Sequence, residues 1–501
     1  MSRTRNSAWN VTTGLVYALA SAAAIFFSTP LLLRWLGPER LGAFRTLTDW
    51  IGHLTFFELG LGGALLAALA ARIGQNNHAA VARMLAAGLR AYFWVTFTQI
   101  VSGIALVVSL PYLITLNQLS NTELRTAGTV ALLPIVLTPL LVFRALAESR
   151  QRGYLNWLLL TAQVLIMTGL SLLTARLGWG LIGQSVAFAA AQVPTLFALT
   201  WDGMRAYREA WKAAPDHTDQ NVLGGLRKPT FIHGLTDRIG LLSDNIVIAW
   251  ILGPTAVVPF FLTQQMAVLA QSQLRGLGQA TWAGLAELSA RGDDDSLRMR
   301  LLELTGMVSG LSLAVLIPIA AYNQSFVRIW VGRDFYAGDL VTGLACFNVM
   351  LWSIYTLWGW VLLGTGHIRH WVPYSIASTL VNVTVSVFGT FTLGVIGPMV
   401  GSAFGSLLVT SWALPRVLRF IFGISPWALW RAALVPFRWG LLYLSVIWVV
   451  ASKIPPQGWL DLITWMGLWT AGGIILWWKL SLQSDERNEW RARLRRTLIF
   501  Q

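Results

Sequence analysis

The sequence predicts an all-α integral membrane protein with about fourteen transmembrane helices. Three observations lead to this fold class. Apolar runs long enough to cross a bilayer recur from one end of the chain to the other. Of the 501 residues, 55% are hydrophobic and only 12% are charged, a charged fraction roughly half that of a typical soluble domain. Several short motifs also recur at one constant spacing, which predicts two related halves.

The predicted spans follow from the positions of the apolar runs. Their approximate limits are 9–33, 42–71, 86–114, 127–147, 154–175, 179–201, 229–251, 257–289, 301–322, 339–363, 371–393, 396–418, 427–451 and 459–480. The spans beginning at residues 42 and 257 are longer than a bilayer requires, so they are expected to tilt or to project beyond it. The first run follows Arg3 and Arg5, as in a signal peptide, but it continues to Leu33, which favours a retained spanning helix.

The distribution of basic residues predicts the orientation of the chain. In a soluble protein the net charge of +15 would suggest a nucleic-acid partner. With a cytoplasmic N-terminus, most basic residues fall in the inner segments, and the outer segments contain only Arg34, Arg40, Arg125, Arg176, Arg328, Arg333 and Lys453. The positive-inside rule therefore accounts for the charge without nucleic acid, and it places both termini of this even-numbered set of spans in the cytoplasm.

An internal repeat defines the two halves. Trp35-Leu36-Gly37-Pro38 matches Ile251-Leu252-Gly253-Pro254 at a shift of 216 residues, and the same shift relates Leu177-Gly178 to Leu393-Gly394 and Gly60-Leu61-Gly62 to Gly276-Leu277-Gly278. The predicted organisation is an N-terminal lobe at 1–201, an amphipathic cytoplasmic linker at 202–228, a C-terminal lobe at 229–420, an extra helix pair at 421–480 and a basic cytoplasmic tail at 481–501. The linker and the tail are expected either to rest on anionic membrane lipids or to be solvated charged faces.

Charged residues inside the predicted spans indicate a functional cavity. The seventh span carries His233, Asp237 and Asp244 on one helical face, with Arg238 beside them. Ionisable groups in hydrocarbon cost several kcal/mol unless they face water, a partner or a substrate. Such a face is therefore expected to line a cavity, and not to face lipid.

The second and eighth spans carry matching polar faces. Arg45, Asp49 and His53 are spaced four residues apart, Glu58 lies deeper in the same run, and Gln264, Gln271 and Arg275 share a face of the eighth span. If these spans surround one cleft, its predicted binding residues are Arg45, Arg238, Arg275 and Gln271, joined by Arg90 and Arg144 near the cytoplasmic ends of the third and fourth spans.

Two interpretations of these charges stay open. Arginine suits a phosphate group in a wet cavity, since it stays charged and its fork binds two oxygens, which favours the phosphate of a lipid carrier. Alternatively, pairs such as Arg45–Asp49 and Asp237–Arg238 compensate each other within the helix bundle. The carboxylates and imidazole are candidates for coupling to H⁺ or Na⁺. They are Asp49, His53, Glu58, Asp237 and Asp244.

Other patterns point to structure and not to catalysis. Gly397, Gly401 and Gly405 have the spacing of close helix packing. The single cysteine, Cys346, rules out an intramolecular disulfide and a cysteine metal cluster. No nucleotide-binding loop, zinc-protease motif or nucleophile elbow is present, so no cofactor, metal or catalytic residue is predicted.

The order of several motifs resembles the Wzx-type polysaccharide and O-antigen flippases. These motifs are LLLRWLGPERLGAFRTL, FFELGLGGALLAALA, GLIGQSVAFAAAQ, LTDRIGLLSDNIVIAWILGP and GVIGPMVGSAFGS. The resemblance covers essentially the whole chain and extends to the MATE-type multidrug exporters and the peptidoglycan-precursor flippases. It implies two six-helix lobes in a V shape and alternating access for an undecaprenyl-diphosphate-linked oligosaccharide in a bacterial inner membrane. It also implies polysaccharide polymerase or assembly proteins as partners.

The resemblance implies a cationic cavity, which would fall on Arg45, Arg238 and Arg275. One departure is that Asp237 and Asp244 add negative charge to the seventh span. A MATE-type exporter of cationic drugs, with a cavity dominated by carboxylates, is therefore a second hypothesis. An integral-membrane enzyme of glycan assembly is a third, which the short outer loops and the absent motifs disfavour.

Overall fold

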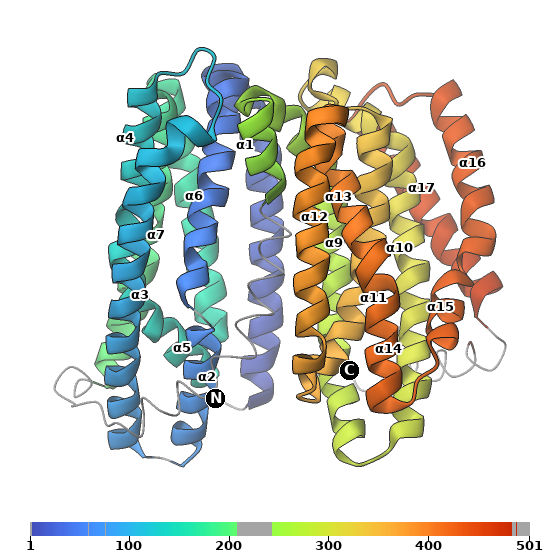
Figure 1. The fold of residues 1–501 in the computed structure, drawn as a ribbon, viewed down its shortest axis with the longest axis horizontal. Helices are drawn as coiled ribbons and strands as arrows, with labels where there is room; N and C mark the ends of the chain where they lie inside the picture. Colours follow the sequence, from blue (N-terminus) through green and yellow to red (C-terminus); the bar gives the residue numbers. More distant parts are fainter. Residues whose placement is uncertain (1–2, 59, 76, 208–242, 483–486, 488–501) are drawn as a thin grey trace. The chain divides into compact units, whose positions relative to one another are not determined.

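The computed structural model describes residues 3–58, 60–75, 77–207, 243–482 and 487. The described chain is helical and contains no β-strand in these ranges (Figure 1). It divides into two compact units, Met1–Val258 and Pro259–Gln501. The predicted all-α membrane fold is confirmed. Most of the predicted linker, the first part of the seventh span and most of the C-terminal tail lie outside the described residues.

The helices of the first unit run alongside one another in Figure 1. They are α1 (Arg3–Leu54), η1 (Thr55–Glu58), α2 (Leu61–Gly74), α3 (His78–Leu113), α4 (Asn121–Leu132), η2 (Leu133–Leu140), α5 (Leu141–Ser149), α6 (Gly153–Arg176) and α7 (Gly180–Ala206). The helical residues 243–251 also belong to this unit, which ends at Val258.

The second unit begins within α9 and contains the remaining helices. They are α9 (Pro254–Ala290), α10 (Asp294–Trp330), η4 (Arg333–Phe335), α11 (Asp339–Gly364), η5 (Ile368–His370), α12 (Val372–Leu393), η6 (Gly394–Ile396), α13 (Gly397–Gly405), the π-helix η7 (Ser406–Thr410), α14 (Ser411–Phe422), α15 (Pro426–Leu434), α16 (Phe437–Lys453), α17 (Trp459–Leu476) and the π-helix η8 (Trp477–Ser481). Asp293 caps α10 by accepting a hydrogen bond from the Ser296 amide at 3.1 Å, and hydrogen bonding with Ser296 holds the pKa of Asp293 below its usual value.

Ten helical segments of the described chain are long and apolar enough to cross a membrane. Two of them each contain two predicted spans. Thr12–Glu58 contains nearly all of the first predicted span and the start of the second, and Val372–Phe422 contains nearly all of the eleventh and all of the twelfth. The eighth predicted span corresponds to α9, and residues 243–251 are the end of the seventh. The protein is therefore a multi-pass membrane protein whose helices match the predicted spans.

The second predicted span is interrupted, which its apolar sequence does not reveal. The helix ends at Leu54, continues as the short 3₁₀ turn η1 and restarts as α2 after Gly60, whose φ is 72°. Gln99 donates a hydrogen bond to the carbonyl oxygen of Leu54 over 3.0 Å, and Thr138 donates one to Gln99 over 3.1 Å. These buried side chains compensate the backbone groups that the break exposes.

The proposed sequence repeat recurs in the backbone at two of its three positions. Gly37 and Gly253 both have positive φ, 78° and 88°, and each is followed by a proline. Gly178 and Gly394 likewise have φ of 77° and 64°. The two halves thus turn alike at corresponding residues. The third pair differs, because Gly60 has positive φ whereas its counterpart Gly276 lies inside the continuous helix α9.

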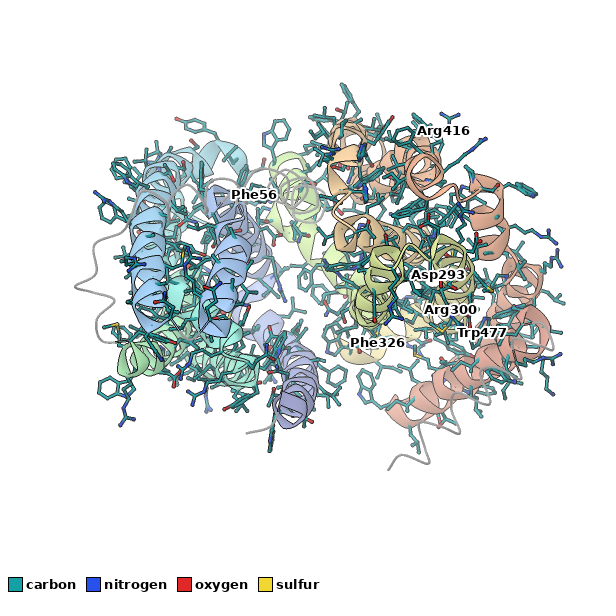
Figure 2. The ribbon with its side chains drawn as sticks, turned by 90° about the horizontal axis from the view of Figure 1, so that it is seen from below. Phe56, Asp293, Arg300, Phe326, Arg416 and Trp477 are labelled. Carbon is teal, nitrogen blue, oxygen red and sulfur yellow. The ribbon has the colours of Figure 1, made fainter. Side chains whose placement is uncertain are left out.

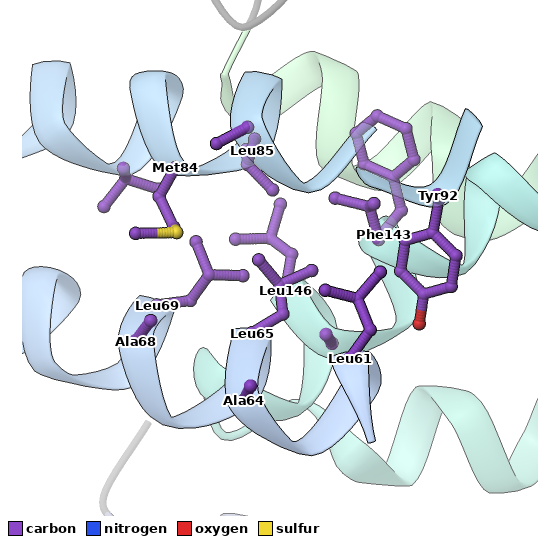
Figure 3. Close-up of a cluster of buried hydrophobic side chains, with 14 of the residues drawn as sticks. Leu61, Ala64, Leu65, Ala68, Leu69, Met84, Leu85, Tyr92, Phe143 and Leu146 are labelled. Carbon is purple, nitrogen blue, oxygen red and sulfur yellow. The ribbon is translucent and has the colours of Figure 1, made fainter. Parts of the chain in front are cut away.

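A tight apolar cluster holds α2, α3 and α5 of the first unit together (Figure 3). Leu61, Leu65 and Leu69 of α2 pack against Met84 of α3 and Phe143 of α5, and all five are almost fully buried. Between membrane helices such packing stabilises through van der Waals contact more than through the hydrophobic effect. The cluster fixes α2 after the break in the second span.

The predicted close packing of the glycine run is confirmed in the second unit. A Cβ atom at Gly401 would lie 2.6 Å from the carbonyl oxygen of Asn382, and one at Gly405 would lie 2.6 Å from that of Ser378. Both neighbours are on α12, so α12 and α13 touch backbone to backbone. Only glycine permits this approach.

Candidate functional site

The polar face of α1 lies opposite its packed face. Ala43, Leu47 and Leu54 join a buried apolar cluster of the first unit. At 100° per residue, Arg45 and Asp49 fall on the other side of the helix, and both are half-buried. Their charges interact with each other. Arg45 and Asp49 thus lie close enough for their charges to interact within the membrane-spanning part of the first unit.

The end of the seventh span supplies the other half of this cluster. Asn245 donates a hydrogen bond from Nδ2 to the Asp49 carboxylate at 2.8 Å. The charge of Asp244 interacts with that of Asp49, and Asp244 Oδ1 is buried without a hydrogen-bond partner among the described residues. Two carboxylates, one guanidinium and one carboxamide therefore meet in one place. We call Arg45, Asp49, Asp244 and Asn245 the charged cluster.

The predicted residues His53 and Glu58 lie next to the break in the second span. His53 Nδ1 is 2.8 Å from the carbonyl oxygen of Asp49, and its ring packs against those of Trp50 and Phe56, the latter labelled in Figure 2. His53 is therefore one helical turn from Asp49 of the charged cluster. Glu58 is the last residue of η1 and is half-buried.

Backbone contacts hold residues 243–254 against α1 and the α3–α4 connection. Thr115 donates its amide hydrogen to the carbonyl of Ala249 at 3.2 Å and its hydroxyl to that of Trp250 at 2.8 Å. These two bonds satisfy carbonyls at the end of a helix, which otherwise lack partners. A Cβ atom at Gly42 would collide with the backbone of Pro254. The charged cluster is thus built on a rigid support.

The remaining predicted residues of the first unit lie apart from the charged cluster. Arg90 is exposed on α3. Arg144 is exposed on α5 and forms an ion pair of 3.4 Å with Glu148, one helical turn away. Asp237, Arg238 and His233 lie outside the described residues.

In the second unit, Arg275 and Gln271 lie on α9. The Arg275 guanidinium is 5.2 Å from the centre of the Trp352 ring on α11, a cation–π contact. Gln271 is half-buried one turn earlier. Since Arg45 belongs to the first unit and Arg275 to the second, the cleft they are predicted to share stays a prediction.

Sequence reasoning missed Asn245, which contacts Asp49 directly. A signal was present, because Asn245 follows Asp244 within an apolar span, but it lies 100° around the helix from the face that was considered. Thr115 was also missed, and as a single loop threonine it gave no signal. Within the described ranges no group of three or more His, Cys, Asp or Glu side chains is arranged to hold a metal ion.

Comparison with known proteins rests on structure. No protein-family model matches the chain, and no curated protein matches it. Among solved structures it is similar to a lipid II flippase MurJ in an inward closed conformation, with a TM-score of 0.68, 12% identity, and coverage of 92% of this chain and 98% of that chain. It is also similar to an inward-facing multidrug resistance MATE family transporter of the MOP superfamily, with a TM-score of 0.59, 16% identity, and coverage of 88% and 96%.

A third similar structure is a MOP superfamily transporter from Pyrococcus furiosus, described as having a binding pocket of reverse polarity. Its TM-score is 0.55 at 16% identity, with coverage of 88% of this chain and 94% of that chain. The chain therefore has the fold that MurJ and the MATE transporters share, over nearly its full length. This confirms the predicted MATE-like fold, and at such low identity it shows the fold alone.

Proposed function

We propose that this chain flips a lipid-linked oligosaccharide, carried on undecaprenyl diphosphate, across the bacterial inner membrane for surface polysaccharide or O-antigen biosynthesis. The observation that carries this proposal is the charged cluster within membrane-spanning segments of a fold shared with a lipid II flippase. Charge in that position is costly unless it faces water, a partner or a substrate, and a polar substrate would supply that role here. The proposed orientation, with both termini cytoplasmic, follows the positive-inside bias.

In this proposal the arginines bind the diphosphate. A guanidinium offers donors in a fork that matches two phosphate oxygens. Arg45, Arg238 and Arg275 are the proposed contacts, with Gln271 beside them and Arg90 and Arg144 nearer the cytoplasm. The sugars travel through a polar cavity while the polyprenyl tail stays in lipid, and alternating access reopens the cavity outward.

The carboxylates supply the proposed coupling to an ion gradient. The charges of Asp49 and Asp244 repel, so an H⁺ or Na⁺ bound between them would be stabilised. His53 lies one turn away, and Glu58 and Asp237 complete the proposed set. Binding of the ion would change the net charge beside Arg45 and thereby its hold on phosphate.

A second candidate function is a MATE-type antiporter for drugs or other organic cations. The same two carboxylates favour it, and so does the likeness to multidrug resistance MATE transporters. An enzyme of glycan assembly is a weaker alternative, because the sequence holds no catalytic motif.

Transport by the purified protein in proteoliposomes separates these candidates. The proposal expects facilitated translocation of a fluorescent undecaprenyl-diphosphate oligosaccharide and no accumulation of ethidium. Ethidium accumulation without lipid translocation would instead establish the antiporter. Turnover of a sugar donor by the same preparation would establish the enzyme.

A further inference from the structure

A second polar feature of the first unit lies away from the charged cluster. A pocket of about 160 Å³ is lined by three helical stripes, one from η2 and α5, one from α6 and one from α7. Asn156 and Gln163 of α6 are seven residues apart on one face, and Gln192 and Thr195 of α7 are three apart, so each helix turns polar groups inward. Thr138 and Arg144 complete the polar lining.

The pocket presents hydrogen-bond acceptors that lack partners. Asn156 is only 4% exposed, and its Oδ1 has no hydrogen-bond partner among the described residues. Thr138 and Thr195 already donate their hydroxyl hydrogens, to Gln99 and to the carbonyl of Leu159, so toward the pocket their oxygens can only accept. A ligand that fits must therefore donate hydrogen bonds.

The two glutamines add both donors and acceptors. Gln163 makes no hydrogen bond to other described residues, and Gln192 uses one amide hydrogen in a 3.4 Å contact with the carbonyl of Phe188. A carboxamide pairs best with a group that donates and accepts together, and a hydroxyl is such a group.

The charge of the pocket argues against an ionic ligand. Arg144 is the only charged residue of the lining, and Glu148 compensates it at 3.4 Å. Asn156 also donates to Glu148, over 2.8 Å, which holds that carboxylate outside the lining. A phosphate would meet the acceptor oxygens of Asn156, Thr138 and Thr195 with no hydrogen to offer, and an organic cation would find no carboxylate there.

The size of the pocket selects a small ligand. Its volume corresponds to about five water molecules. One sugar ring with its hydroxyl groups suits such a volume, and the rest of a longer glycan would lie outside the pocket. Leu141, Leu160 and Leu196 line the remainder and suit the apolar C–H faces of the ring.

We propose that this pocket binds one uncharged sugar unit of the transported glycan, and so contributes to substrate selection separately from the diphosphate site. This inference rests on the proposed function. The carboxamides of Gln163, Gln192 and Asn156 bond the hydroxyls of that unit. The diphosphate is assigned to Arg45, Arg238 and Arg275; Arg144, whose charge Glu148 compensates, is the one proposed diphosphate contact that also lines this pocket.

The test compares transport of sugar-bearing lipids by the full-length chain in proteoliposomes. The probes are fluorescent undecaprenyl diphosphates that carry one glucose, galactose or N-acetylglucosamine, with sugar-free undecaprenyl diphosphate as a competitor. The test variant is Gln163→Leu combined with Gln192→Leu. The control is Gln457→Leu, the same exchange at an exposed loop residue.

The double variant is expected to transport the preferred sugar-bearing lipid about tenfold more slowly, since two hydrogen bonds to the sugar are lost. The concentration of sugar-free competitor that halves transport should stay unchanged, and so should transport by the control. If the double variant does not fold, Leu160→Phe is the second variant, because it fills the pocket without removing a polar group and should cause the same loss.

Two negative results have different meanings. If the wild type transports a sugar-bearing lipid and the double variant, or Leu160→Phe, transports it equally well, the sugar pocket is refuted and the proposed function stands. If the wild type transports none of the three lipids, the proposed function is refuted and the sugar pocket with it.

Discussion

Gly42→Ala should loosen the support of the charged cluster. The added methyl group would collide with the backbone of Pro254, its carbonyl carbon lying 2.6 Å away, so residues 249–254 must move from α1. Overpacking of this kind costs about 1–3 kcal/mol. The two hydrogen bonds from Thr115 to the carbonyls of Ala249 and Trp250 depend on the same placement and contribute roughly 1 kcal/mol each.

Hydrogen exchange of the Thr115 amide reports this loosening directly. That amide donates to Ala249, and Thr115 is exposed, so its exchange follows the opening of this contact. A loss of about 1.4–3 kcal/mol in opening free energy predicts exchange roughly ten to a hundred times faster in the variant. The control is Gly63→Ala in α2, where an added methyl group meets nothing within 4 Å. Unchanged protection of the Thr115 amide in Gly42→Ala would show that the contact of Gly42 with Pro254 does not hold residues 249–254 in place.

Three further predictions concern packing and charge. Gly401→Ala should lower the free energy of unfolding of the second unit by about 1–3 kcal/mol in chemical denaturation. The control is Gly359→Ala, whose added methyl group meets nothing within 4 Å, and it should be neutral or mildly stabilising. Equal stabilities of the two variants would contradict the close packing at Gly401. Arg275→Gln should lower the rate of lipid transport at least tenfold. Arg416→Gln is the matched control, because both arginines lie over tryptophan rings and Arg416 is on the periphery of the second unit in Figure 2, and it should leave the rate unchanged. Equal losses in the two variants would contradict the assignment of Arg275 to the binding site. Asn245→Ala should lower the initial rate of transport about tenfold, because the hydrogen bond of Asn245 to the Asp49 carboxylate is lost. A wild-type initial rate in this variant would contradict a role of Asn245 in transport.

Much of the fold follows from local sequence. The positions of the spans follow from long apolar runs, which few structures other than a membrane-spanning helix explain. The ten spanning segments of the described chain accordingly coincide with predicted spans. The repeated Gly37-Pro38 and Gly253-Pro254 motifs also match in the backbone, because Gly37 and Gly253 both adopt positive φ. The glycine run at Gly397 was predictable because its spacing alone sets the packing.

Other features depend on contacts that sequence periodicity does not encode. The break after Leu54 occurs in an apolar run without proline, and it is stabilised by Gln99, a residue 45 positions away. The contact of Asn245 with Asp49 joins residues 196 positions apart. The pocket around Asn156 combines three helices, each of which shows only a mild polar stripe. Contacts between residues so far apart in the sequence can be identified only in the folded structure.

The central claim is that charge persists in these membrane helices because it handles a polar lipid headgroup. The most direct test is the initial rate of undecaprenyl-diphosphate oligosaccharide translocation by Arg45→Gln, compared with Arg125→Gln, an arginine exposed on α4. We expect a rate at least tenfold lower for Arg45→Gln and a wild-type rate for Arg125→Gln. Wild-type translocation by a folded Arg45→Gln protein would contradict the claim.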